Sequence, residues 1–537
     1  MEVPHPLPYA SVEEELYASE AGEHWRRIGT DPHHGIVVPL FSLRSTTSCG
    51  IGEFTDLLPL IELCAKCKMD IIQLLPINDT GLDASPYAAL SAFALNPIYL
   101  GLDALPYLDD EDRSHPAYGE LKDYNGGTRI AYPEVRHLKM AFLRAYCQRH
   151  KERLLAEPDY RHYVQSSPWL PDYALFSALH RKNLHRGWES WPEREQNPSQ
   201  ENLQALQREH REEATFHQLL QYLCDRQMGY VRHVADKAKV LLMGDVPILV
   251  GRDSCDVWRH RDYFNLDLVA GAPPDVYTAD GQNWGLPCYQ WEVLEADNFR
   301  WWEERLSVVA RHFHLYRVDH IIGFFRIWAI PFKQPASEGV FTPGVFPDWY
   351  EQGVKLMRML LSKSPLLPIG EDLGVIPPVV RRTLALLGIP GTKVLRWERW
   401  PEGHGPFTPQ RSYPHASLTT LSTHDAENMR LYWQRYPGDS RELAHFLNLK
   451  WERVLPTDHL AQILKWSHAT SSLFHVNPIQ EYLALEPDFT SRSLERERVN
   501  LPGTLSILNW SWRLPCPIET LLHHPTFSKK VADLLPN

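Results

Sequence analysis

The chain has 537 residues, a hydrophobic fraction of 43%, a charged fraction of 23% and a formal net charge of −12. These values suit a large globular domain with insertions. The acidic balance argues against a nucleic-acid partner, and no apolar run reaches the ~18 residues that predict a membrane span.

The N-terminus lacks both the basic and the apolar segments of a signal peptide, so none is predicted. Eight cysteines are scattered through the chain, which favours reduced thiols and a cytoplasmic location. Cys64-Ala-Lys-Cys67 is formally a CxxC, but it lies in a helical pattern without a second CxxC. We interpret it as two helix cysteines with no metal or redox role.

The predicted organisation begins with a polar, Glu-rich N-terminal helical arm over residues 1–34. Residues 35–537 are predicted to form one catalytic domain. Its first units are a strand from Gly35, a helix over Phe54–Cys67 with an apolar period near 3.6, and a strand from Asp70.

From about residue 105 to residue 235 the pattern changes to long amphipathic helices, including Leu138–Leu155 and Glu201–Val231. We expect a mainly helical insertion there. Strand and helix patterns alternate again from Lys239, and this alternation is expected to continue to about residue 515.

Three short strings each close an apolar run that reads as a strand. They are Arg317-Val-Asp319, Gly370-Glu371-Asp372 and Thr423-His424-Asp425. Acidic side chains at the carboxyl ends of successive strands, with helix-sized gaps between, are typical of the active site of a (β/α)8 barrel. Three such carboxylates suit hydrolysis or transfer of glycosides.

Strand geometry suggests roles for these carboxylates. Arg317 and Asp319 are two apart and share a face, so the guanidinium favours the ionised form of Asp319, a suitable nucleophile. Glu371 and Asp372 point to opposite sides. We choose the longer Glu371 as general acid/base, because a nearby negative Asp319 would raise its pKa. Asp425 could hold sugar hydroxyls and distort the ring.

Each string alone has a structural explanation. Arg317 with Asp319 could be a salt bridge, Glu371-Asp372 a helix N-cap, and His424-Asp425 a loop pair. The ordered set is more informative, in a chain with 18 Trp and 23 Tyr. Most aromatic residues fill cores, but sugar rings also bind with their C–H faces on such rings.

The chain resembles the 4-α-glucanotransferases, the amylomaltase or disproportionating-enzyme family of glycoside hydrolases, from about Gly35 to Arg513. The motifs that carry the resemblance, beside the three strings, are Ser85-Pro-Tyr87, Ser91-Ala-Phe93-Ala-Leu-Asn96-Pro97, Gly244-Asp245-Val-Pro247, Asp253-Ser-Cys-Asp256-Val-Trp258, Ala270-Gly-Ala-Pro273-Pro274-Asp275, Gly281-Gln282-Asn-Trp284-Gly285, Asn500-Leu-Pro502-Gly503 and Asn509-Trp510-Ser-Trp512-Arg513.

The resemblance implies a (β/α)8 TIM barrel related to the α-amylases, with helical insertions, no separate carbohydrate-binding domain, and no metal or organic cofactor. It implies Asp319 as nucleophile, Glu371 as acid/base and Asp425 as transition-state stabiliser. It also implies a mobile loop over Pro273–Gly281 that covers the cleft. The residues implied to contact sugar or support the triad are Ser85, Tyr87, Asp275, Gln282, Trp284, Arg317 and His424.

The implied reaction is disproportionation by a retaining double displacement. Segments of an α-1,4-glucan move from a malto-oligosaccharide donor to a glucan or glucose acceptor, and glucose is released. For Trp284, the alternative is packing between loop and barrel. Departures at Leu82, Leu95 and Ala426-Glu427-Asn428 leave donor length, acceptor choice and cyclic products open, and the oligomeric state is open too.

Two other functions stay under consideration. An α-glucan hydrolase would use the same triad with water as acceptor. A catalytically silent glucan-binding protein would be expected to lack one of the three carboxylates, and all three are present.

Overall fold

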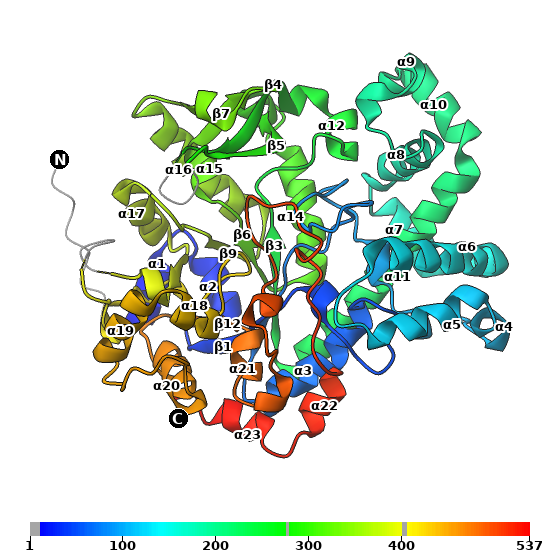
Figure 1. Cartoon of the computed structure of the whole chain (residues 1–537). Helices are drawn as coiled ribbons and strands as arrows, with labels where there is room; N and C mark the ends of the chain where they lie inside the picture. The colour runs from blue at the N-terminus through cyan, green and yellow to red at the C-terminus, as the bar shows by residue number, and fades with distance from the viewer. Residues whose placement is uncertain (1–10, 275–278, 400–404, 537) are drawn as a thin grey trace.

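The computed structural model describes residues 11–274, 279–399 and 405–536. Within them, eight parallel strands close into a barrel in the order β1-β12-β11-β10-β9-β6-β3-β2, which confirms the predicted (β/α)8 barrel (Figure 1). The strands are β1 (His33–Val37), β2 (Ile71–Gln73), β3 (Leu241–Val246), β6 (Leu315–Val318), β9 (Leu367–Gly370), β10 (Gly391–Val394), β11 (Ser417–Thr420) and β12 (Phe474–Pro478).

The barrel strands are short and mostly buried, as expected for parallel strands covered by helices. All residues of β9, β11 and β12 are buried. Small residues allow the strands to approach closely: a Cβ added at Gly35 would lie 1.8 Å from the carbonyl oxygen of Ile71 on β2. Since the strands are parallel, their carboxyl ends meet at one rim.

Amphipathic helices surround the barrel and bury one face each. On α14, the buried residues include Trp302, Leu306 and His312. The longer covering helices are α3 (Leu57–Lys66), α14 (Arg300–His312), α16 (Asp348–Lys363), α17 (Pro378–Leu387), α19 (Pro437–Phe446) and α20 (Thr457–His468). The shorter ones are α12 (Cys255–Arg259), α13 (Trp291–Ala296), α15 (Ile322–Phe325), α18 (Met429–Arg435), α21 (Ile479–Leu483), α22 (Ile518–His523) and α23 (Phe527–Ala532).

Two helices precede the first strand, α1 (Val12–Ala18) and α2 (Gly22–Ile28). The buried Trp25 of α2 donates its indole N–H to the carbonyl oxygen of Gly388 at 2.8 Å, just beyond α17. Gly388 has φ +76°, the left-handed conformation that commonly ends a helix. This contact fixes the N-terminal helices against the barrel.

Helices α4 to α11 lie between β2 and β3 and project to one side of the barrel (Figure 1). The predicted continuous helix over Glu201–Val231 is wrong, because the chain breaks at His210. Lys139 joins these helices to the barrel through an ion pair with Glu53 at 2.6 Å, and both side chains are buried. The helices are α4 (Asp110–Arg113), α5 (Pro116–Asp123), α6 (Tyr132–Ala156), α7 (Pro158–Gln165), α8 (Leu170–Lys182), α9 (Glu193–Gln196), α10 (Gln200–Glu209) and α11 (Arg211–Ala238).

A second, antiparallel sheet interrupts the barrel alternation, so the expectation of uninterrupted barrel units after Lys239 is wrong. Its strand order is β5-β4-β7-β8. The strands are β4 (Phe264–Ala272), β5 (Gln282–Tyr289), β7 (Ile327–Pro331) and β8 (Val340–Thr342). Gly285 and Pro287 obscure β5 in the sequence, but an edge strand accommodates both.

All eight cysteines are free, and seven of them are buried. Burial raises the pKa of the Cys67 thiol to about 11, which leaves it a poor nucleophile. No helix among the described residues combines the length and the apolar character needed to cross a membrane.

Candidate active site

Three neighbouring strands bring the acidic residues together at the carboxyl rim. Asp245 on β3 is the register partner of Arg317 on β6, and Val318 on β6 is the partner of Gly370 on β9. Asp319 and Glu371 follow directly on these strands and therefore emerge side by side. The backbone N–H of Glu371 donates to the carbonyl oxygen of Val318 at 2.9 Å.

The Arg317 guanidinium lies among three carboxylates. Its Nη1 donates to both oxygens of Asp245 at 2.8 Å, and its Nη2 lies 2.9 Å from Asp319 Oδ1 and 3.9 Å from Glu371 Oε2. These last two oxygens can therefore be no more than about 7 Å apart, which admits the ~5 Å spacing of a retaining pair. Although burial opposes it, the surrounding carboxylates raise the pKa of Arg317, which keeps its charge.

Glu371 and Asp372 occupy different environments, as strand alternation predicts. Asp372 is 2% exposed and accepts hydrogen bonds from the Thr392 N–H at 2.7 Å and from Arg381 Nε at 3.1 Å. It therefore supports the barrel wall. Glu371 instead accepts the backbone N–H of His320 at 2.9 Å and lies beside Arg317.

The pKa of the Glu371 carboxyl is raised to about 8. Burial is the largest cause; the Arg317 charge opposes the shift, and the negative Asp319 adds to it. The sequence predicted a raised pKa with the Asp319 charge as its cause. In the structure the direction is the same, but burial is the main cause. A carboxyl with this pKa is largely protonated near neutral pH, as a general acid requires.

Asp425 follows β11 and has the opposite tendency. Its side chain opens to solvent, yet Asn500 Nδ2 donates to Oδ1 at 2.6 Å and His424 Nε2 lies 3.4 Å from Oδ2. Crowding by protein atoms acts to raise its pKa, but the nearby His424 and the Asn500 amide hold it at about 2. Asp425 is thus an ionised carboxylate at neutral pH.

An aromatic group borders Asp425. The Tyr87 ring stacks on the His424 imidazole with centroids 5.4 Å apart, and Trp510 lies 5.8 Å from each ring. The Tyr87 hydroxyl donates to Asp245 Oδ2 at 2.8 Å. Tyr87 and His424 are therefore joined both to the carboxylate cluster and to each other.

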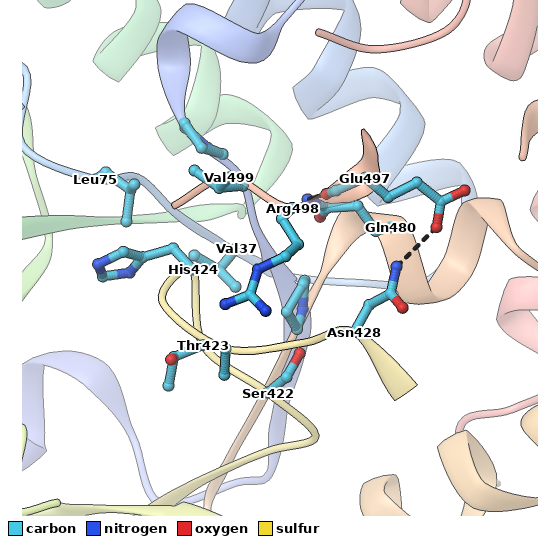
Figure 2. A pocket seen from close by; sticks show the side chains of 13 residues that line it. Val37, Leu75, Ser422, Thr423, His424, Asn428, Gln480, Glu497, Arg498 and Val499 are labelled. Atoms are coloured by element: carbon cyan, nitrogen blue, oxygen red, sulfur yellow. Dashed lines mark hydrogen bonds between the residues drawn. The ribbon is translucent and has the colours of Figure 1, made fainter. Parts of the chain in front are cut away.

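A small pocket lies behind the Thr423–Asn428 loop (Figure 2). Its volume is about 20 Å³, room for a single water molecule. Asn428 donates to Glu497 at 2.7 Å across it, and His424 and Arg498 form other parts of its wall. The loop that carries Asp425 is thus supported from behind by polar contacts.

The other predicted binding residues are placed less directly. Trp284 Nε1 donates to Gln282 Oε1 at 3.1 Å, and the Trp284 ring meets the His320 ring edge-on at 5.0 Å, next to Asp319. Trp284 also packs against the core, so both interpretations apply. Ser85 accepts the Tyr87 N–H at 3.4 Å and contacts none of the three catalytic candidates. Asp275, within the predicted mobile loop, lies outside the described residues.

Sequence reasoning left three residues of this site without a role. Asp245 lies at the carboxyl end of β3, one residue before the strand ends, so a similar signal could have found it. Asn500 and Trp510 follow β12 by more than twenty residues, and only the fold places them beside Asp425.

Two clusters elsewhere have ligand atoms close enough for a metal ion: His34 with His468 and His475, and Asp109 with Asp112 and His150. In the first cluster, the His34 and His475 rings stack with centroids 4.7 Å apart, and His34 Nδ1 lies 3.0 Å from His468 Nδ1, within hydrogen-bond distance. Arg149 already neutralises the aspartates at 2.7 and 2.9 Å. Neither cluster adjoins the triad.

With this geometry in place, comparisons with known proteins settle the family. The sequence model of the 4-alpha-glucanotransferase family matches residues 38–519. A 4-alpha-glucanotransferase of Chlamydia pneumoniae is 42% identical over 519 residues, 96% of this chain and 98% of that protein. This chain belongs to the 4-alpha-glucanotransferase family. A more distant family member from Thermus thermophilus is 33% identical over 86% of this chain and 90% of its own.

Solved structures of the family agree on the fold. The amylomaltase from Streptococcus agalactiae in complex with acarbose has a TM-score of 0.79 at 22% identity, covering 94% of this chain and 98% of that one. The amylomaltase from Corynebacterium glutamicum has a TM-score of 0.76 at 24% identity, covering 95% and 76%. The barrel and its additional elements are therefore a shared architecture.

Proposed function

We propose that this 4-alpha-glucanotransferase family member transfers α-1,4-glucan segments between malto-oligosaccharides by a retaining double displacement. The supporting observation is the Arg317 guanidinium, which lies 2.9 Å from Asp319 and 3.9 Å from Glu371 while the pKa of Glu371 is about 8. An ionised carboxylate beside a protonated one is the arrangement that a retaining mechanism needs.

In the first step, Glu371 protonates the leaving 4-hydroxyl oxygen while Asp319 attacks the anomeric carbon. The C–O bond to the leaving glucan breaks, and a covalent glucosyl-enzyme forms. Asp425, ionised and held by Asn500, stabilises the oxocarbenium-like transition state and binds sugar hydroxyls. Arg317 and Asp245 hold the nucleophile in position.

In the second step, Glu371 takes the proton from the 4-hydroxyl of an incoming glucan or glucose. The acceptor oxygen bonds to the anomeric carbon, and the C–O bond to Asp319 breaks and releases its carboxylate. Transfer exceeds hydrolysis when the cleft excludes water until a sugar acceptor is bound. Tyr87, His424 and Trp510 offer stacked rings beside Asp425 on which a sugar can lie. Ser85, Gln282, Trp284 and Asp275 are proposed as further sugar contacts.

The decisive experiment is incubation of the purified protein with maltotriose alone, with products resolved by length. A ladder of longer malto-oligosaccharides plus glucose, with reducing ends conserved, is expected. Asp319→Asn and Glu371→Gln should each abolish it, while the matched change at exposed Glu351, Glu351→Gln, should leave it intact. Full activity in either triad variant would refute the mechanism.

Two other outcomes correspond to the other functions. Glucose and maltose with rising reducing ends would indicate an α-glucan hydrolase that uses the same carboxylates. Binding of malto-oligosaccharides without turnover of any length would indicate a glucan-binding protein. We also propose a cytoplasmic location, which the free thiols support. Family membership supports a further proposal, a role in maltodextrin or glycogen turnover.

A further inference from the structure

A cavity separate from the three proposed catalytic carboxylates lies between the helical insertion and the loop that carries Tyr87. Its volume is about 680 Å³, within the ~300–1,000 Å³ typical of small-molecule sites. One wall is the chain from Asp79 to Ile98. The other walls are faces of α6, α8 and α11, the helices to one side of the barrel in Figure 1. None of the three proposed catalytic carboxylates lines it.

The helix walls are rich in basic and imidazole side chains. On α6, Pro133, Arg136, His137, Met140, Ala141 and Arg144 recur at helical spacing and therefore form one face. The basic and imidazole side chains that line the cavity are Arg136, His137, Arg144, His180, Arg181, His185 and His217. Leu90, Ile98 and Met140 supply apolar surface between them.

Among the three arginines that line the described cavity wall, Arg136 has the fewest partners. Only 17% of its side chain is exposed, and its closest carboxylate oxygen, Asp79 Oδ1, is 3.8 Å away. Within the described part of the chain it makes no hydrogen bond. A largely buried guanidinium with unused N–H groups calls for an acceptor, and these donors border the cavity.

Two further guanidinium groups line the cavity, Arg144 on α6 and Arg181 on α8. Arg144 and Arg181 share one carboxylate, Glu213, with distances of 2.7 and 2.9 Å, and His217 lies 3.4 Å from the same group. Burial lowers the pKa of His185, and the nearby His180, Arg136, Arg181 and His217 lower it further. Arg136 and Arg181 therefore both lie near His185.

We infer that this cavity binds a small organic phosphate, with the phosphate held between Arg136 and Arg181 and a sugar or nucleoside body against the apolar surface. Guanidinium groups bind phosphate oxygens through paired hydrogen bonds, and imidazoles add further donors. A neutral glucan is a poorer fit, because sugar rings bind on aromatic side chains. Apart from the imidazoles, Tyr132 is the one aromatic side chain in the described cavity wall, and its hydroxyl already donates to the Trp510 carbonyl oxygen at 2.9 Å.

The site is connected to the catalytic rim by a short path. Asp79, which faces Arg136, accepts the Gly81 N–H at 3.0 Å, and Asp83 accepts the Ser85 N–H at 2.8 Å. Two residues later, Tyr87 donates to Asp245 at the rim. A ligand that draws Arg136 away from Asp79 would act on the loop that holds Tyr87. We therefore expect it to change KM for maltotriose more than kcat.

The test is calorimetric titration of the full-length protein with glucose 1-phosphate, ADP, inorganic phosphate and glucose. At least one of the two organic phosphates should bind, inorganic phosphate more weakly, and glucose not at all. Arg136→Gln and Arg181→Gln should each weaken binding about tenfold or more. Arg226→Gln is the matched control, since Arg226 lies on α11, pairs with Glu157 and does not line the cavity.

Three outcomes would overturn the inference. Neither organic phosphate binds the wild-type protein; Arg226→Gln loses as much phosphate affinity as Arg136→Gln and Arg181→Gln; or glucose or maltotriose binds more tightly than the phosphates and the same two variants weaken that binding. Thermal melting of each variant checks folding, and the wild-type titration stands without any variant. Phosphate-free disproportionation of maltotriose is measured in parallel, so failure of this inference is distinguishable from failure of the proposed function.

Discussion

Arg317 bridges two carboxylates of the proposed active site, Asp245 and Asp319. A planar guanidinium reaches Asp245 with one nitrogen and Asp319 with another, and neither contact depends on the sugar. A lysine ammonium is a point charge and could not span both groups. The residue therefore fixes the nucleophile before substrate binds.

We predict that Arg317→Lys lowers kcat for maltotriose disproportionation about 100-fold, because the charge is kept but the bridging geometry is lost. Steady-state kinetics provide the measurement. Arg358→Lys, at an exposed fork with Glu20, should change nothing and serves as control. Wild-type kcat in Arg317→Lys would show that the bridge has no role in positioning.

Glu371 predicts a pH dependence. As the pH rises through about 8, Glu371 loses the proton that it must donate, so kcat should fall on the alkaline side with an apparent pKa near 8. The raised pKa also affects stability, because the folded protein holds the Glu371 proton more tightly than the unfolded chain does. The resulting contribution to the free energy of unfolding is fully present below about pH 4.5 and is lost as the pH rises through about 8.

A variant without an ionisable group at position 371 should not lose stability at alkaline pH in this way. Glu371→Gln is expected to unfold at a higher urea concentration than the wild type at about pH 9, and to differ little from it at about pH 4. Urea midpoints at the two pH values provide the measurement. An unchanged or lower midpoint at the alkaline pH would contradict the raised pKa.

At the scale of elements, the loop after β11 is held by a group of ion pairs around Glu427. Its carboxylate lies 2.8 Å from Arg435, 3.0 Å from Arg498 and 3.3 Å from Arg396. Arg498 adjoins Asn500, which holds Asp425. Glu427 therefore ties the Asp425 loop to the segment that orients it.

Glu427→Gln should lower kcat about tenfold with a smaller change in KM, because the loop loses its anchor while the sugar contacts remain. Glu442→Gln is the matched control, since Glu442 is half exposed and pairs with Arg399 at 2.9 Å. If the two variants had equal kcat and KM, Glu427 would have no role in anchoring the Asp425 loop.

The barrel was predictable from sequence to the extent that its strands are apolar and end in polar residues. Arg317-Val-Asp319 and Gly370-Glu371-Asp372 carry both signals, and the strands lie where expected. The antiparallel sheet was not predictable in this way, because β5 contains glycine and proline and pairs with β4 and β7 rather than with the barrel. The proposed N-terminal arm and insertion boundaries stay predictions.

The candidate site shows the same limit. Asp319, Glu371 and Asp425 each follow a strand and can be read from local pattern. Asn500 and Trp510 lie on a long connection after β12, where the sequence has no period that would point them at Asp425. Their position depends on contacts between distant segments, such as the Asn500 N–H to the His424 carbonyl oxygen at 3.1 Å.

For the whole molecule, the buried pair of Lys139 and Glu53 links the insertion to the barrel. The Lys139 ammonium donates to Glu53 at 2.6 Å and to the Ile98 carbonyl oxygen at 2.8 Å. Burial raises the pKa of Glu53 to about 7 even though Lys139 opposes this shift. Without Lys139, the carboxyl would be buried with no counter-charge beside it.

Lys139→Met should therefore destabilise the protein by about 3 kcal/mol. The loss should be larger at about pH 8 than at about pH 6, because an isolated buried Glu53 is tolerated only while protonated. Urea midpoints give the comparison, with Lys151→Met on the same helix as control, where the pair with Glu212 is 4.0 Å long and exposed. An equal loss of unfolding free energy at both pH values would argue that Lys139 does not neutralise an ionised Glu53.

For the whole molecule, we also expect the carboxylates at the proposed catalytic rim to select which sugars enter. Even when Glu371 is protonated and His424 carries a proton, Asp245, Asp319 and Asp425 outnumber the cations that face them. Such a field attracts the positive charge that develops on a sugar ring and repels a phosphate. The wall of the cavity behind the Tyr87 loop instead contains three guanidinium groups, beside Asp79 and Asp83. If both proposals hold, a neutral glucan and a phosphorylated metabolite would bind on opposite sides of a single loop.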